Sequence, residues 1–324
     1  MGIVTGSLLA LALAAAPSPQ TLAPGVTLVP GEFVPGRQPD GNTIVVDAPQ
    51  GLVVFDTGRH AAHAQAVLDL AKRRGKPIAA IVNSHWHLDH VGGNVALRAA
   101  FPQAKVYATD AIDAALGGFL ASYRRQLAQA IEQAAKDPAA QASYRAELAL
   151  IDAGERLQPT ERVTRSGLRD IAGKRVEIVV AAPAVTHGDL TLFEPVSRTL
   201  LAGDLVTLPV PLFDTACPAR WSAALADLDR ADFRLLVPGH GAPMRHAQLA
   251  QYRRAFDALV ACAASEGDAA RCTDGWIADA DAGALVPEAE RAFARQLVDY
   301  YVGNVLRGDK ARLEANCATD DKVD

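Results

Sequence analysis

The chain has 324 residues, and its 50% hydrophobic and 21% charged residues are ordinary for a globular protein large enough to bury its own core. A formal net charge of -5, without any run rich in Lys or Arg, argues against a nucleic-acid-binding protein of the usual basic kind. We therefore expect a small-molecule substrate and no nucleic-acid partner.

Residues 1–20 are similar to a secretory signal peptide, because a short apolar run of Leu and Ala is followed by small residues and a Pro/Ser stretch. No Lys or Arg precedes the apolar run, so an apolar N-terminal tail is the alternative. The run is too short for an ordinary transmembrane helix, and no other segment reaches about 18 uninterrupted apolar residues. We expect no stable membrane insertion and a location in the bacterial periplasm or outside the cell.

The first half of the chain predicts strands followed by a helix. Over residues 25–58, short runs of Val, Ile and Thr alternate with Pro-Gly, Asp-Gly and Pro-Gln-Gly turns, which predicts an antiparallel ribbon. Residues 61–74 have helical periodicity, with basic residues in the last turn and Gly75 after it. A short apolar strand, "IAAIV" at 78–82, follows. This order of elements indicates a layered, mixed α/β fold.

The second half alternates helical and strand patterns. Residues 110–154 are rich in Ala, with Arg, Gln and Glu at helical spacing, which predicts one or two inserted helices. From residue 248 the chain is helical again, and its last predicted helix runs from Pro287 to Gly308. Strand patterns lie at 174–181, 190–195, 198–206 and 233–241. We therefore divide the chain into a leader (1–20), a main domain with the insert (21–247) and a helical extension packed on it (248–324).

The stretch "HWHLDH" places three of the chain's eight histidines and an aspartate directly after the strand predicted at 78–82. Side chains at i and i+2 of an extended segment face the same way, so His85 and His87 can bind one ion together. Asp89 and His90 follow where the chain turns into a helix, and they can point to a second ion. Imidazole and carboxylate are ligands for zinc-like ions in water-holding sites. Three further candidates lie at predicted strand ends: His187, Asp204 and His240.

Four motifs in the order HWHLDH, THGD, AGD and PGHG resemble those of the metallo-β-lactamase superfamily over residues 25–245. The resemblance implies a four-layer αββα sandwich, in which two mixed β-sheets pack together with helices outside. It also implies two zinc ions, or iron or manganese in their place. The first ion would be held by His85, His87 and His187, the second by Asp89, His90 and His240, and Asp204 would bridge both.

The resemblance also implies a mechanism. Two ions about 3.5 to 4 Å apart share a water and lower its pKa toward about 7, so that a bridging hydroxide attacks a carbonyl or phosphoryl centre. Asp89 is the candidate catalytic residue that orients this water and passes its proton on. Asp56, in "VVFDTG", matches a family position that orients the ligands rather than binding the metal. The expected enzyme is a hydrolase of an ester, thioester, lactone, lactam or phosphoester.

Within the superfamily, the chain resembles exported bacterial members associated with quinoprotein relay systems, with which it shares "PLFDTACPARW" and a cysteine-bearing helical tail. Three alternatives stay open at this point. In β-lactamases proper the position of Asp204 is typically Cys or Ser. Persulfide dioxygenases share much of the motif but use one iron for oxidation. A metal-stabilised binding protein would have a site closed to water.

Four cysteines, with spacing unlike that of a zinc ribbon, allow three disulfide pairings. Cys262 and Cys272 flank a short polar link between two helical patterns, so we pair them, and by elimination Cys217 pairs with Cys317. In an oxidising compartment two disulfides are expected. Four buried free thiols are the alternative.

Overall fold

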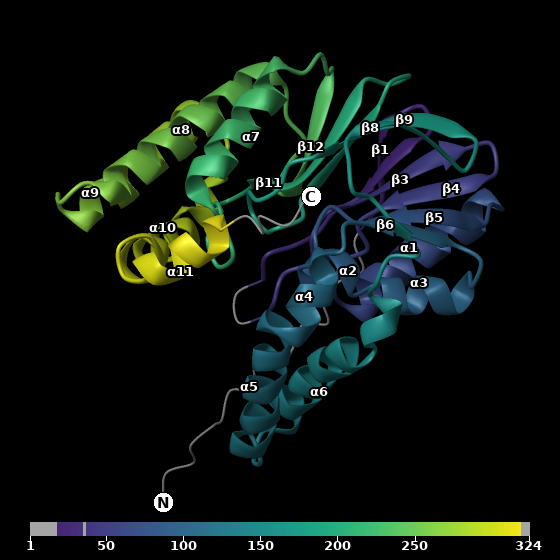
Figure 1. The fold of residues 1–324 in the computed structure, drawn as a ribbon, viewed down its shortest axis with the longest axis horizontal. Helices are drawn as coiled ribbons and strands as arrows, with labels where there is room; N and C mark the ends of the chain where they lie inside the picture. The colour runs from purple at the N-terminus through teal and green to yellow at the C-terminus, as the bar shows by residue number, and fades with distance from the viewer. Residues whose placement is uncertain (1–17, 35–36, 319–324) are drawn as a thin grey trace, which may run out of the picture.

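Two β-sheets face one another with helices on both outer sides, in a computed structural model that describes residues 18–34 and 37–318 (Figure 1). This arrangement confirms the expected αββα sandwich with a helical insert and a C-terminal helical extension. Most of the suggested leader lies outside the described residues. None of the described helices is long and apolar enough to cross a membrane.

The first sheet is mixed. Its first four strands pair antiparallel, as the turn signals predict, and the last three add in parallel. The parallel part begins after α1 (Ala61–Arg74), because the helix carries the chain back over the sheet before the next strand starts. The strands, in spatial order, are β1 (Gln20–Ala23), β2 (Val26–Val29), β3 (Thr43–Ala48), β4 (Gly51–Phe55), β5 (Ile78–Val82), β6 (Lys105–Ala108) and β7 (Glu161–Arg162).

The second sheet is antiparallel except for one parallel pair, formed by its last two strands in the sequence. The helix α7 (Pro218–Arg230) makes the crossover between that pair. The strands, in spatial order, are β12 (Leu235–His240), β11 (Thr199–Thr207), β10 (Leu190–Glu194), β9 (Lys174–Val180) and β8 (Gly167–Ile171).

A buried apolar layer joins the two sheets. Phe55 and Val82 from the first sheet belong to the same cluster as Leu192 and Val237 from the second. Every second side chain of a strand faces this layer, so the alternating apolar positions fix which face of each sheet is inside. The edge where β5, β11 and β12 end is therefore held rigidly, and the candidate ligands lie there.

The outer faces are covered by different helices. On the first sheet, α1 packs together with α3 (Asn94–Ala100) through a second apolar cluster that includes Val67 and Leu97. On the second sheet, α7 and α8 (His246–Ala264) pack through residues such as Trp221 and Phe256, whose rings lie 4.8 Å apart. Trp221 is thus a core residue.

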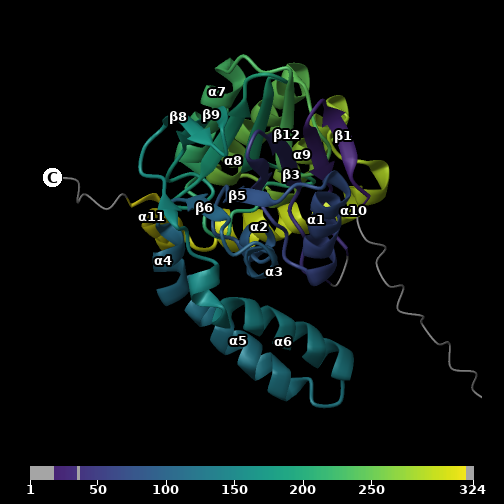
Figure 2. The ribbon, with the colours of Figure 1, turned by 90° about the vertical axis from the view of Figure 1, so that its right-hand side faces the viewer.

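The insert is a helical hairpin that projects away from the sandwich, as Figures 1 and 2 show from two sides. Three helices and a short 3-10 turn fill the predicted segment 110–154 and slightly exceed it: α4 (Ala111–Gly117), α5 (Phe119–Gln133), α6 (Pro138–Asp152) and the turn Gly154–Arg156. Asp137 caps α6 by accepting a hydrogen bond from the backbone N–H of Ala140. The root of the insert packs against α2 (Leu88–Val91) through Leu88, Leu120 and Ile151.

The C-terminal extension contains α8, α9 (Ala269–Ala282), α10 (Arg291–Tyr300), a π-helical turn (Tyr301–Leu306) and α11 (Lys310–Cys317). The sequence predicted a single helix from Pro287 to Gly308. The structure instead has a 3-10 turn at Glu288–Glu290 before α10, and α11 was not foreseen.

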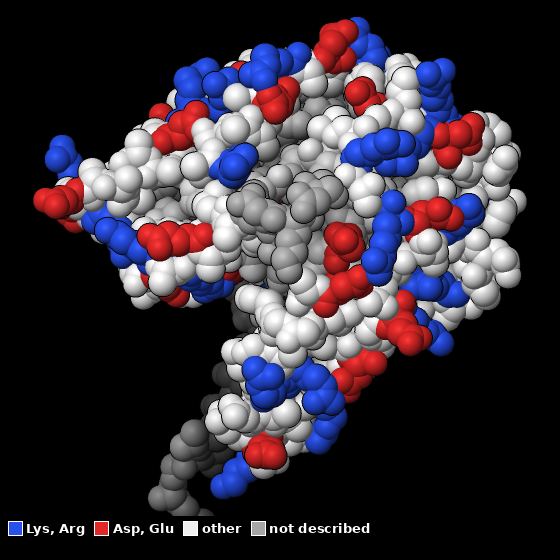
Figure 3. Space-filling model, in the orientation of Figure 1, with Lys and Arg blue, Asp and Glu red and all other residues white. Residues whose placement is uncertain are grey.

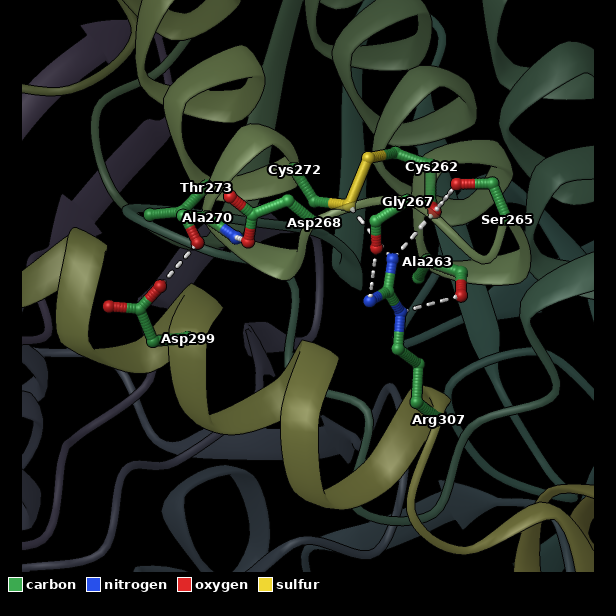
Figure 4. The surroundings of a disulfide bond; sticks show 10 residues. All are labelled: Cys262, Ala263, Ser265, Gly267, Asp268, Ala270, Cys272, Thr273, Asp299 and Arg307. Carbon is green, nitrogen blue, oxygen red and sulfur yellow. Dashed lines mark hydrogen bonds between the residues drawn. A yellow bond between two sulfur atoms is a disulfide. The ribbon is translucent and has the colours of Figure 1, made fainter.

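Two disulfides hold this extension, in the pairs that the sequence suggests. Cys262–Cys272 joins α8 to α9, and Cys217–Cys317 ties α11 to the start of α7. Arg307 reinforces the first bridge, because its guanidinium donates hydrogen bonds to the carbonyl oxygens of Cys262, Ala263 and Gly267 (Figure 4). The extension is therefore cross-linked both within itself and to the main domain.

Candidate metal centre

The candidate ligands converge where several strands end. His85 and His87 lie in the loop after β5, and Asp89 and His90 lie on α2. Asp204 is on β11, and His240 is the last residue of β12. All six are buried except His87, which is half-buried. A loop after one strand of the first sheet, two neighbouring strands of the second and one short helix thus bring together residues more than a hundred positions apart.

These side chains form two groups that share one carboxylate. His85, His87 and Asp204 make the first group and Asp89, His90 and His240 the second, and within each group the ligand atoms lie within 4.8 Å of one another. The Asp204 oxygens are divided between them. Oδ2 lies 3.8 Å from Nε2 of His85, whereas Oδ1 lies 3.2 Å from Nε2 of His90 and 3.6 Å from Nε2 of His240. Asp204 can therefore bridge two cations.

The second group is closely packed. Nε2 of His240 lies 3.0 Å from Oδ2 of Asp89, and the Nε2 atoms of His90 and His240 lie 3.3 Å apart. Two ring nitrogens facing each other at this distance cannot both carry a proton without repulsion. A cation between them, which both lone pairs ligate, resolves that conflict.

Asp56 fixes the protonation of two of the histidines. Its Oδ2 lies 2.9 Å from Nδ1 of His90 and accepts a 2.7 Å hydrogen bond from Oγ of Ser84. Because the Ser84 hydroxyl gives its only proton to Asp56, it accepts from Nδ1 of His85, 2.9 Å away. Both histidines then carry their proton on Nδ1, and their Nε2 lone pairs face inward as ligands. Asp56 thus contacts His90 directly and His85 through Ser84.

Thr215 determines which ring nitrogen of His87 carries the proton. Its Oγ1 donates to the carbonyl oxygen of Val185 and lies 2.9 Å from Nε2 of His87. With its proton committed to Val185, the hydroxyl accepts from Nε2–H of His87, which leaves Nδ1 as the ring atom with a lone pair. Thr215 was missed by the sequence analysis, although it lies in the quoted segment "PLFDTACPARW".

The electrostatics of the site favour positive charge between the carboxylates. Burial works to lower the pKa of His90, but Asp204, Asp89 and Asp56 around it raise that pKa well above its ordinary value. Burial lowers the pKa of His85 well below its ordinary value, so that ring is neutral. A proton is thus stabilised where a metal cation would lie in the second group.

Buried atoms without partners supply a direct test of whether a metal fits. Among the described residues, Nε2 of His85 and both carboxylate oxygens of Asp204 are buried and have no hydrogen-bond partner. Leaving such groups unpaired costs about 1 to 3 kcal/mol each, more when they are charged. Their convergence on one space means that the donor set fits divalent cations of the zinc type.

His187 is placed differently from the other suggested ligands. Its side chain is exposed, and among the described residues it belongs to neither group. It is at the tip of a tight turn, in which Thr186 donates hydrogen bonds from its N–H and its hydroxyl to the Asp189 carboxyl. Burial raises the pKa of Asp189 to about 8. The first group therefore contains two histidines rather than three.

Two glycines make room for the ligands. Gly203, at a φ of +54°, would place a Cβ 2.5 Å from Cβ of Ser84. Gly239, the first glycine of "PGHG", would place one 2.0 Å from Oδ1 of Asp204. Neither position tolerates a side chain without displacing a residue that forms or orients the centre. The motifs AGD and PGHG therefore contain these glycines beside the candidate ligands Asp204 and His240.

The sequence profile of the metallo-beta-lactamase superfamily matches residues 36–264, which contain all of these groups. The chain belongs to this superfamily. A metallo-beta-lactamase from Pontibacter korlensis has a similar structure, with a TM-score of 0.55 and 17% identity over 74% of this chain and 99% of that one. One from Hirschia baltica gives a TM-score of 0.52 and 20% identity over 74% and 96%. At this identity the likeness shows the shared fold.

Curated relatives in the superfamily have several names. A linear primary-alkylsulfatase from a Pseudomonas species is 26% identical over 218 residues, which is 62% of this chain and 41% of that protein. A hydroxyacylglutathione hydrolase from a Synechococcus species is 48% identical over 48 residues, 15% of this chain and 19% of that protein. The chain thus spans less than half of the curated relatives it matches.

A buried ion network beside the candidate metal centre was not foreseen. Arg59, three residues after Asp56, donates to both oxygens of Glu147 on α6 at 2.7 and 2.9 Å and lies 3.4 Å from Oδ1 of Asp89. Tyr123 on α5 donates to the same Glu147 at 2.7 Å. The helical insert is therefore connected through Arg59 to a candidate ligand. Glu147 is 88 residues from Arg59, so no local pattern signals the pair.

His60 and His63, which follow Asp56 closely in the chain, are held by partners. His63 is 2% exposed, and its Nε2 lies 2.8 Å from Oγ1 of Thr43. Burial lowers its pKa to about 4, so it is neutral. Nδ1 of His60 lies 2.8 Å from the carboxylate of Asp40. Both histidines thus hold the segment that contains Asp40 and Thr43.

A cleft of about 410 Å³ opens beside the centre, and His87 and Asp89 lie in its wall. The insert contributes Phe119 and Tyr123, and the extension contributes Phe293 and Tyr301. The volume is in the range of small-molecule sites. The two elements added to the sandwich thus both line one cleft.

Proposed function

We propose that the protein is a dinuclear metal-dependent hydrolase, with zinc as its metal, that cleaves an ester-type bond of a small molecule. The observation that carries the proposal is the position of Asp204. Its two buried oxygens have no hydrogen-bond partner among the described residues, and each faces a different group of histidines. That arrangement suits a carboxylate shared by two cations.

We infer unequal metal positions. One side offers four protein donors, namely Asp89, His90, His240 and one oxygen of Asp204, all of them buried. The other offers His85, His87 and the second oxygen of Asp204. Three ligands leave an open coordination position on that side, as in catalytic zinc sites. The four-donor position should bind its ion more tightly.

When bound, two such ions supply a hydroxide nucleophile at neutral pH and polarise the oxygen of the scissile group. The oxygen of water would bond to the acyl, sulfuryl or phosphoryl centre, the bond to the leaving oxygen would break, and the proton would pass to that oxygen. Asp89 is the proposed proton carrier, because its Oδ2 faces the centre while Arg59 stabilises its Oδ1. Thr215 and Asp56 hold the imidazoles in place.

The names of the relatives support hydrolysis but not one bond. An alkylsulfatase and a hydroxyacylglutathione hydrolase act on different ester types. An experiment must therefore identify the type of bond that this protein cleaves. On the face drawn in Figure 3, Lys and Arg side chains are interspersed with Asp and Glu, and the described residues there form no large basic patch. This supports a small molecule over nucleic acid. Two disulfides support export to an oxidising compartment.

The test is the metal content of protein purified without added metal, together with turnover of carboxylic ester, sulfate ester, thioester, lactone, lactam and phosphodiester substrates. We expect close to two zinc ions per chain and hydrolysis of one substrate class. Asp204→Asn should reduce both metal content and turnover, whereas Asp69→Asn, an exposed carboxylate on α1, should change neither. One iron per chain with oxygen uptake on a persulfide would overturn the proposal.

A further inference from the structure

Two aromatic rows lead outward from the candidate metal centre along the cleft. On one side the ring of Trp86 lies 4.6 Å from that of His87 and 5.4 Å from that of Phe119 on the insert. On the other side the ring of Phe33 lies 4.7 Å from that of His240 and 6.0 Å from that of Phe293 on the extension. Each row thus connects a candidate ligand to an element outside the sandwich.

The space between these rows is lined mainly by apolar surface. Leu88, Leu120, Leu212 and Leu297 line the same cleft. Phe119 is 44% exposed although it is large and apolar, and it is at the edge of the cleft rather than in a core. An exposed aromatic ring beside a catalytic cleft is expected where a ligand covers it.

The charged groups that line the cleft are paired within the protein. Arg59 lies between Glu147 and Asp89, and Arg37 contacts Asp40 at 2.8 Å. Asp214 accepts a 2.6 Å hydrogen bond from the hydroxyl of Tyr301 and lies 3.9 Å from Arg312. A charged substrate body would have to break one of these pairs or remain unpaired, which is costly in a partly buried site.

We infer that this cleft selects substrates with an uncharged, ring-containing hydrocarbon body, which lies between the rows of Trp86–Phe119 and Phe33–Phe293 while the scissile ester group reaches the metals. The inference rests on the proposed hydrolase function but concerns binding of the substrate body. Phe119 and Phe293 determine specificity in this arrangement. A charged conjugate such as a glutathione thioester is disfavoured by the same walls.

Binding can be measured without turnover through Trp86. The other two tryptophans, Trp221 and Trp276, are buried in the core at 0% and 1% exposure, so a cleft ligand should quench Trp86 selectively. The probe is acetophenone, a neutral aryl ketone with no bond to hydrolyse, and its charged counterpart is 4-acetylbenzoate. We expect saturable quenching by acetophenone that is lost in Trp86→Phe, and at least tenfold weaker binding of 4-acetylbenzoate.

Phe119→Ala and Phe293→Ala should each weaken acetophenone binding by about three- to tenfold, which corresponds to losing one aromatic contact. Leu168→Ala is the control, because Leu168 on β8 is 59% exposed and does not line the cleft. Equal or tighter binding of the charged probe, or unchanged affinity in both Phe variants, would overturn the inference. If acetophenone binds as expected and no ester is cleaved, the hydrolase proposal fails while this inference stands.

Discussion

Nδ1 of His90 and Oδ2 of Asp56 lie 2.9 Å apart, and the same oxygen accepts a hydrogen bond from the Ser84 hydroxyl that orients His85. One carboxylate therefore orients a ligand in each group. Asp56 itself has a φ of +57°, in the left-handed region that costs a residue with a side chain about 1 kcal/mol or more. The surrounding structure maintains this conformation at the point where it supports both groups.

Replacing Asp56 by Asn should weaken metal binding at both positions. The amide keeps the shape, but in either orientation its NH2 group faces a donor: the N–H of Ser84 at the Oδ1 position, or the Ser84 hydroxyl and Nδ1–H of His90 at the Oδ2 position. The hydrogen bonds that hold Ser84 and the two imidazoles are therefore disturbed. We expect a loss of about 10- to 100-fold in metal affinity. Competition with a chromophoric zinc chelator measures it. Unchanged affinity would show that Asp56 has no orienting role.

Removing His187 should leave metal binding intact. Its side chain is exposed and outside both groups, so His187→Ala should retain two ions per chain, whereas His85→Ala should lose the ion of the three-donor position. Equilibrium dialysis against cobalt, with the visible spectrum recorded, distinguishes the two positions. A decrease to one ion in His187→Ala would mean that the loop moves His187 inward when metal binds.

Breaking the buried pair between Arg59 and Glu147 should destabilise the protein. Glu147→Gln leaves the Arg59 guanidinium with weaker compensation in a buried place, and we expect about 2 to 4 kcal/mol lower free energy of unfolding. Urea unfolding measures this loss. The matched control is Asp152→Asn, because the Arg124–Asp152 pair on the same insert is exposed and should contribute less than about 1 kcal/mol. Equal effects of the two variants would contradict this expectation.

We expect the protein to lose stability in acid because of Glu194, which is not part of the candidate centre. Burial works to raise its pKa, but hydrogen bonds from Ser197 and the Lys174 ammonium at 2.9 Å lower it below its ordinary value. A carboxyl with a lower pKa in the folded state stabilises the fold above its unfolded-state pKa, and this contribution disappears as the pH falls through the folded-state pKa.

Wild type should therefore exceed Glu194→Gln in free energy of unfolding by about 1 to 2 kcal/mol at pH 7. Denaturant titrations of both proteins at pH 7 and near pH 3 give the comparison. The gap should shrink at the acidic pH. A gap that stays constant with pH would mean that the charge of Glu194 is unimportant.

The sequence predicted most of the sandwich because the signals are local, and the same signals indicated six of the side chains that the structure brings together. The helix 61–74 matches α1, and "IAAIV" matches β5. The close spacing in HWHLDH brings His85, His87 and His90 together at the end of one strand. The burial of His63 also follows from a local signal, since His63 lies on the same face of α1 as Val67 and Leu70.

Other features depend on contacts between distant parts of the chain. The orientation of His187 is set by the turn that Thr186 and Asp189 form, and not by its place in the motif order. The tautomer of His87 depends on Thr215, 128 residues later. Neither contact has a local sequence pattern, so the ligand set of the first group could be assessed only with the fold in view.

The disulfides also constrain α10, because of its position in the chain. The segment that bears Phe293 lies between Cys272 and Cys317, each of which is bonded to an earlier part of the chain. Oxidation therefore closes one wall of the cleft beside the candidate centre into a covalent loop, whereas the candidate ligands need no such bond. A reduced chain can carry a complete set of ligands and still hold that wall by packing alone. Maturation of the binding surface then depends on the thiol chemistry of the compartment in which the protein folds.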